Sequence, residues 1–168
     1  MTNLGYRFFV LICLLSIQIT SFAQEDESLL SIAHKNYELG DYKEAIKYLN
    51  KAVEQDPKSP EVFYLLGVCK SSIEQNEEAI IDFNIALSLD PSYAEVYFEK
   101  GYTLFVMGQL EEAILNYDKT IELQPKNAIA FVNRGSIKCI QGNKEGAMND
   151  WMKAKELGAP ILELECED

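Results

Sequence analysis

The sequence repeats with a period of 34 residues, and this period constrains the fold more than any other feature. Four columns of equivalent residues share the spacing: Ala45, Ala79, Ala113 and Ala147; Leu49, Phe83, Tyr117 and Trp151; Ala33, Gly67, Gly101 and Gly135; and Pro57, Pro91 and Pro125. A fixed period of this length is typical of solenoids, in which each unit buries its apolar face against its neighbours. We therefore predict an array of four units, at residues 26–59, 60–93, 94–127 and 128–161.

Each unit is predicted to contain two helices. In the third unit, apolar and small residues recur at helical spacing, first in Tyr97, Gly101, Leu104 and Gly108, and then in Leu110, Ala113, Tyr117 and Ile121. The expected helices span residues 27–39, 42–55, 60–73, 76–89, 94–107, 110–123, 128–141 and 144–157.

Start and stop signals agree with these ranges. Asp41 and Ser92 each precede a glutamate at capping-box spacing, and Ser59 stands before a proline at the first helical position. Glycine can end the first helices in the left-handed conformation, at Gly40, Gly108 and Gly142. The three prolines of the repeat end the second helices, because proline lacks an N–H group and clashes with the preceding turn.

The columns resemble those of the tetratricopeptide repeat family. That resemblance implies an all-α solenoid of about four helix-turn-helix repeats forming a right-handed superhelix, with first helices that line a concave surface binding peptides or partner helices. This sequence departs from the family pattern at Glu74, in a glycine column, at Thr120, in an alanine column, and at Ala159, which replaces the last proline.

The N-terminus has the layout of a secretory signal. Arg7 precedes an apolar run of twelve residues at 8–19, and small residues stand at Ser21 and Ala23. A helix that spans a bilayer needs roughly 20 residues. We predict a signal peptide at 1–23, cleaved after Ala23, and a secreted or periplasmic protein with no membrane span after cleavage. The alternative is an uncleaved anchor.

The chain carries a formal net charge of −12, which argues against binding to nucleic acid or to an anionic membrane surface. The acidity is concentrated in the central units. The second unit holds six acidic residues and one lysine. The last seven residues, 162–168, form an acidic tail. This distribution favours a partner with apolar or basic character.

The sequence offers little for catalysis or metal binding. It contains no phosphate-binding loop, no H-E-x-x-H, no G-x-S-x-G and no C-x-x-C, and its single histidine, His34, has no nucleophile at helical spacing. We expect no cofactor, no metal and no enzymatic activity. The alternative is an enzyme with an unrecognised site in the groove.

The cysteines are not expected to form a disulfide scaffold. Cys69 and Cys139 lie two units apart, too far for a bridge, and both are predicted to be reduced and partly buried. Cys166 could instead meet Cys139 or a cysteine of another chain.

The resemblance places a candidate binding groove on the first helices. Its predicted partner-binding residues are Tyr64, Val68, Glu95, Phe98, Tyr102, Phe105 and Val132. Single aromatic residues such as Tyr64 and Phe98 could instead be ordinary packing residues of the inner wall. Where some family members clamp an acidic C-terminus with basic residues, this chain has apolar or acidic ones, such as Leu30, Leu65, Glu95 and Glu99, which disfavours that activity.

The sequence thus predicts a non-catalytic scaffold that binds a partner protein or peptide in its concave groove. A second hypothesis is a structural subunit of an envelope complex, or a homo-oligomer that assembles through its C-terminal end.

Overall fold

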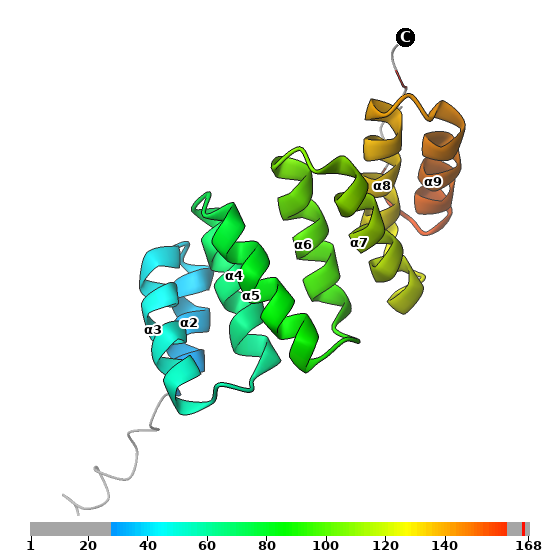
Figure 1. Ribbon diagram of the computed structural model, residues 1–168. Coiled ribbons are helices and arrows are strands. Elements are labelled where there is room, and N and C mark those ends of the chain that lie inside the picture. Colours follow the sequence, from blue (N-terminus) through cyan, green and yellow to red (C-terminus); the bar gives the residue numbers. More distant parts are fainter. Residues whose placement is uncertain (1–27, 161–165, 167–168) are drawn as a thin grey trace, which may run out of the picture.

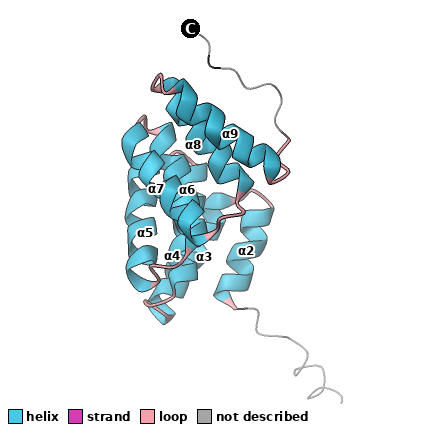
Figure 2. Cartoon of the chain, turned by 90° about the vertical axis from the view of Figure 1, so that its right-hand side faces the viewer, coloured by secondary structure: helices cyan, strands magenta, loops and turns pink. Residues whose placement is uncertain are grey.

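A computed structural model shows the architecture of residues 28–160 and of Cys166. Every element in this part of the chain is an α-helix (Figure 2). The helices are α2 (Leu29–Glu38), α3 (Tyr42–Gln55), α4 (Pro60–Ser72), α5 (Asn76–Leu89), α6 (Ala94–Val106), α7 (Leu110–Leu123), α8 (Ala128–Ile140) and α9 (Lys144–Glu156). The predicted signal peptide at 1–23 and nearly all of the acidic tail lie outside the described residues.

The helices form pairs that follow one another from α2 and α3 at one end to α8 and α9 at the other (Figure 1). The two helices of each pair pack against each other, and each second helix packs against the next first helix. The first helix α6 also contacts the first helices α4 and α8 directly. This arrangement is the predicted all-α solenoid, with the first helices close together along one side of the stack.

The observed helices begin and end within two residues of the predicted ranges. The Asp41 carboxylate accepts a hydrogen bond from the backbone N–H of Glu44, and the Ser59 hydroxyl accepts one from Val62, so both predicted caps are confirmed. The linker glycines Gly40, Gly108 and Gly142 have φ values of 76°, 75° and 78°. Glu74, which replaces glycine at the same place, adopts the same left-handed conformation with φ of 65°.

The predicted cap at Ser92 is wrong. Its backbone N–H and hydroxyl both donate to Asp90 Oδ1, at 2.9 and 2.7 Å, and the residue before α6 is Tyr93, whose side chain forms no capping bond. Asp90 follows α5 directly, so its carboxylate closes a turn around Pro91 and takes the hydroxyl that would otherwise cap α6.

The core depends on a close contact inside each unit. A Cβ atom added to Gly67 would lie 2.4 Å from the ring of Phe83, and one added to Gly135 would lie 2.7 Å from the indole of Trp151. In the third unit the corresponding contact, between Gly101 and Tyr117, is looser at 3.3 Å. The first unit has Ala33 and Leu49 at these places, both fully buried. Alanine, which is larger than glycine, is thus paired with leucine, which is smaller than the aromatic residues of the other units.

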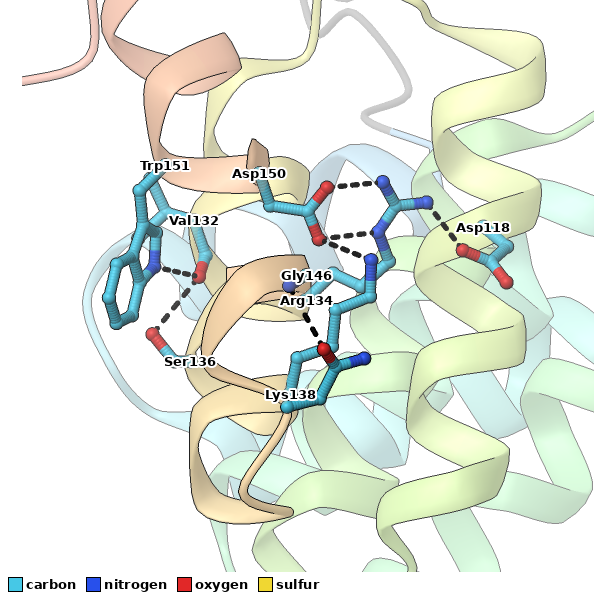
Figure 3. A network of polar contacts seen from close by, with 9 residues as sticks. Asp118, Val132, Arg134, Ser136, Lys138, Gly146, Asp150 and Trp151 are labelled. Atoms are coloured by element: carbon cyan, nitrogen blue, oxygen red, sulfur yellow. Dashed lines mark hydrogen bonds and ion pairs between the residues drawn. The ribbon is translucent and has the colours of Figure 1, made fainter. Parts of the chain in front are cut away.

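Two units contain a buried ion pair between their helices. Lys70 Nζ of α4 lies 2.5 Å from Asp82 Oδ2 of α5, and Lys138 Nζ of α8 lies 2.9 Å from Asp150 Oδ2 of α9. The two pairs occupy equivalent places two repeat periods apart. Arg134 adds a second cation to Asp150, donating to both carboxylate oxygens (Figure 3). Both aspartates are buried, so these pairs replace the water that the charges lose on folding.

Polar contacts also join neighbouring units at equivalent places. Lys100 of α6 donates to Asn84 of the preceding second helix at 2.7 Å. One repeat later, Arg134 of α8 reaches back to Asp118 of α7 (Figure 3). The two contacts fix each first helix against the second helix before it.

The prediction that Cys139 is reduced is wrong, because Cys139 forms a disulfide with Cys166, with Cα atoms 5.6 Å apart. The partner comes from the tail rather than from another unit, so the distance argument against a Cys69–Cys139 bridge still holds. Cys69 is a free thiol, as predicted, but it is fully rather than partly buried, and burial raises its pKa to about 11.

Replacing Gly67 with alanine is expected to destabilise the protein by about 1–3 kcal/mol, because the new methyl group overlaps the Phe83 ring. Adding Phe83→Leu reproduces the Ala33/Leu49 pair of the first unit and should give a favourable coupling of about 0.5–3 kcal/mol in a double-mutant cycle. Urea unfolding measures both quantities. Gly101→Ala is the matched control, expected to be much better tolerated; equal losses at both glycines, or strict additivity, would contradict this account.

Replacing Lys70 with leucine is expected to cost about 3–5 kcal/mol of stability, because Asp82 is left buried without its cation. The double variant Lys70→Leu/Asp82→Asn carries the residues found in the third unit, Leu104 and Asn116, and should recover most of the loss. Burial raises the pKa of Asp82 despite the lysine. The single variant should therefore regain stability as pH falls through that raised pKa, since the protonated acid needs no cation. A deficit that persists at low pH in urea unfolding would argue against this cause.

Candidate functional site

Two cavities lie along the side of the stack where the first helices meet. The first, here called the Glu99 cavity, has a volume of about 440 Å³ and lies between the second and third units. Its lining residues are Tyr42, Val68, Ser71, Ser72, Glu74, Asn76, Glu99, Tyr102 and Val106. The second, the Phe105 cavity, has a volume of about 300 Å³ and lies between the third and fourth units. It is lined by Tyr102, Phe105, Tyr117, Asn133, Ser136 and Ile137.

Tyr102 is the residue that the two cavities share. Tyr102 is 49% exposed, which is unusual for a large aromatic residue in a helix packed on four neighbours. Of the predicted groove residues, Val68 lines the Glu99 cavity with Tyr102, and Phe105 lines the other one. The structure therefore brings three of the seven predicted residues together around one exposed tyrosine.

Tyr64 and Phe98 are packing residues of the wall. The Tyr64 ring lies 5.2 Å from that of Tyr93, and burial raises the pKa of its hydroxyl above the usual range. The Phe98 ring meets Tyr117 edge-on at 5.7 Å and packs against the core of the third and fourth units. Neither residue lines the Glu99 cavity or the Phe105 cavity, and their ring contacts are those that the packing interpretation expects.

Glu95 and Val132 lie on the first helices but line neither cavity. The exposed Glu95 carboxylate accepts a hydrogen bond of 2.7 Å from Gln124 Nε2. The Val132 carbonyl accepts bonds from the Trp151 indole and the Ser136 hydroxyl, at 3.3 and 3.0 Å (Figure 3). His34 also lies on this side, with Nε2 3.3 Å from Glu61 Oε1.

Glu99 lies in the groove but is not among the seven predicted partner-binding residues; the sequence marks it only as an acid on the concave face. It is half-buried in the cavity wall, and no described side chain gives its carboxylate a hydrogen bond or an ion pair. Burial raises the pKa of Glu99. The sequence does distinguish Glu99 by its repeat column, in which it is the single acid among neutral residues: Ser31, Leu65, Glu99 and Asn133.

The Phe105 cavity combines apolar walls with a few fixed polar groups. Asn133 Nδ2 donates a hydrogen bond of 3.2 Å to the hydroxyl oxygen of Tyr117. Ser136 donates to the Val132 carbonyl, so its hydroxyl is held in place as well. A cavity of this kind suits an apolar side chain, because the polar groups at its edge already have partners.

The part of the chain that the structure describes forms no candidate metal site and no membrane-spanning helix. Within residues 28–160 and Cys166, no group of three histidine, cysteine or acidic residues is placed to hold a metal ion. No helix in the same part of the chain has the length and hydrophobicity needed to cross a bilayer.

Comparison with known proteins agrees with the repeat. A family model described as "TPR repeat" matches residues 33–69. Two models described as "Tetratricopeptide repeat" match residues 60–93 and 94–127. A comparison with curated proteins gives no match.

Several solved structures are similar to this chain. A crystal structure of MamA is 28% identical, with a TM-score of 0.76, over 83% of this chain and 82% of that one. MamA from Desulfovibrio magneticus RS-1 (41-end) is 22% identical with a TM-score of 0.73, over 81% of this chain and 78% of that one, which supports the fold alone. The first TPR of Spaghetti (RPAP3), bound to the HSP90 peptide SRMEEVD, is 28% identical with a TM-score of 0.66, over 68% of this chain and 93% of that one.

The chain belongs to the tetratricopeptide repeat family, because family models match it between residues 33 and 127 and because its 34-residue columns, its stacked helix pairs and its structural neighbours agree with them.

Proposed function

We propose that this protein is an exported, non-catalytic scaffold that binds a segment of a partner protein in the groove formed by α4, α6 and α8. The observation that carries this proposal is the pair of adjacent cavities on either side of the exposed Tyr102. Exposed aromatic groups next to preformed cavities are the usual anchors of protein interfaces. The RPAP3 neighbour is bound to a peptide, which supports peptide binding by a protein of this fold.

The partner is proposed to be apolar or basic rather than acidic. The peptide in the RPAP3 neighbour, SRMEEVD, ends in acidic residues. In this chain, the acids Glu61, Glu95 and Glu99 lie on the first helices, and no cavity-lining residue of the groove is basic. A shared fold does not transfer a ligand, and a carboxylate-rich segment would meet like charge here.

Export is proposed from two features. The sequence at 1–23 has the order of a secretory signal. The Cys139–Cys166 disulfide supports an oxidising compartment, since such bonds are rare in the cytosol.

A second candidate function is assembly through the C-terminal end. Asn84 and Asp118 occupy the column through which α5 and α7 contact the following unit. In α9 this column holds Met152, which is 54% exposed, and Met148 nearby is 53% exposed. An apolar residue at an interunit position with no further described unit favours contact with another chain. Light scattering over a range of concentrations separates a monomer from an assembling subunit.

The double variant Tyr102→Ala/Phe105→Ala is expected to lose most of its partner capture, because it removes the aromatic side chain shared by the two cavities and the Phe105 ring while leaving the core columns intact. The measurement is affinity capture from envelope and secreted fractions, quantified by mass spectrometry, with circular dichroism to verify the helices. Leu115→Ala is the control, since Leu115 is 65% exposed on the second helix α7. Undiminished capture by the folded double variant would contradict the groove proposal.

The mature protein is expected to begin at Gln24 and to label with one thiol reagent per chain after denaturation without reduction, at Cys69. Intact-mass spectrometry measures both the start of the chain and the number of labels. Cys166→Ser should raise the number to two by freeing Cys139. An intact N-terminus, or three labelled thiols in the cleaved protein, would count against export into an oxidising compartment.

A further inference from the structure

We propose that the Glu99 cavity is a subsite for a basic side chain, lysine or arginine, of the bound segment. This inference rests on the proposed function, namely that a partner segment lies in the groove. It adds the chemistry of one contact and the place where that contact is made.

The charge balance of the cavity is the first argument. The buried acids Asp82 and Asp150 each have a lysine within 3 Å, and Asp150 has an arginine as well. Glu99 is half-buried, yet none of the described residues offers its carboxylate a cation or a hydrogen-bond donor. Its raised pKa reflects that unrelieved loss of water. A partner's cation would supply what the lysines supply to the two aspartates.

The rest of the lining suits a cation too. Glu74 contributes a second carboxylate, and none of the nine lining residues is basic. The rings of Tyr42 and Tyr102 also line the cavity, and Tyr37 packs on Tyr42 with ring centroids 5.9 Å apart. Aromatic faces attract ammonium and guanidinium groups, and arginine stacks on them through its flat head.

The size of the cavity fits a side chain rather than a whole folded element. At about 440 Å³ it is within the range of about 300–1,000 Å³ in which proteins enclose small ligands. The hydroxyls of Ser71 and Ser72 already have partners, Thr103 Oγ1 at 3.0 Å and the Val68 carbonyl at 2.8 Å. Glu99 is therefore the wall group that a bound apolar side chain would leave without a partner.

The neighbouring cavity gives the subsite a direction along the groove. Tyr102 separates the acidic Glu99 cavity from the more apolar Phe105 cavity. A segment that places a basic side chain against α4 and α6 can therefore place an apolar one between α6 and α8. The groove would recognise a basic and an apolar residue on opposite sides of the Tyr102 ring.

The test uses pools of acetylated and amidated nonapeptides in which one central residue is fixed as lysine, arginine, norleucine or glutamate. The protein should retain the lysine and arginine pools and release the other two. The best lysine peptide is then made again with norleucine, which keeps the alkyl chain and removes the charge. Fluorescence anisotropy should show at least tenfold weaker binding of the norleucine peptide.

On the protein side, Glu99→Gln should weaken the lysine peptide about tenfold and abolish the difference between lysine and norleucine. Glu54→Gln is the matched control, because it removes one negative charge from an exposed position on α3. It should leave both affinities unchanged. A comparable loss in this control would assign the effect to overall charge and overturn the subsite.

The outcomes separate this inference from the proposed function. Equal binding of lysine and norleucine peptides that still depends on Tyr102 and Phe105 would overturn the basic subsite and leave the groove in place. Retention of the glutamate pool would do the same. Failure to retain any pool above the level of the Tyr102→Ala/Phe105→Ala variant would overturn both.

Discussion

The contact that the stack depends on is the close approach of the two helices in each unit. In the second, third and fourth units a glycine faces an aromatic ring at this contact. In the second and fourth units the rings of Phe83 and Trp151 occupy the space that a Cβ atom would need. This contact sets the distance between the helices and buries one face of each first helix. The opposite face of the first helices is thereby left free of the core, and it is this face that forms the two cavities.

The sequence predicts this part of the structure well because its signals are local or periodic. Helix ends follow from Gly40 and Pro57, and the core follows from columns at one spacing. The failures involve competition between residues outside that pattern. Asp90 takes the Ser92 hydroxyl in a turn, and Cys139 finds its partner in the tail, which no repeat column describes. In the groove, columns select Val68, Tyr102 and Phe105, but only packing shows which of them share a cavity, and that Glu99 lies in the wall.

The distribution of basic residues explains why the groove is left acidic. Lys70 and Lys138 are both held between helices by buried aspartates, and Arg134 is shared between two acids from α7 and α9. Lys100 reaches the preceding unit through Asn84. These four cations thus join helices to one another, whereas Lys119 pairs with Glu122 inside α7. Because these cations are used inside the stack, the carboxylate of Glu99 on the groove side has no cation beside it among the described residues.

The packing columns and the groove columns are different positions of the repeat, so a groove position can change while the packing columns stay the same. The place of Phe105 is held by Tyr37, Ser71 and Cys139 in the other units, which serve as an exposed ring, a polar wall and a disulfide anchor. The place of Glu99 is held in the second unit by Leu65, which is almost fully buried. An apolar residue at 99 would therefore be compatible with the stack and would avoid the desolvation of a charge. The described contacts of α6 give Glu99 no role in folding. We explain its carboxylate instead by a cation that enters the groove from outside the chain.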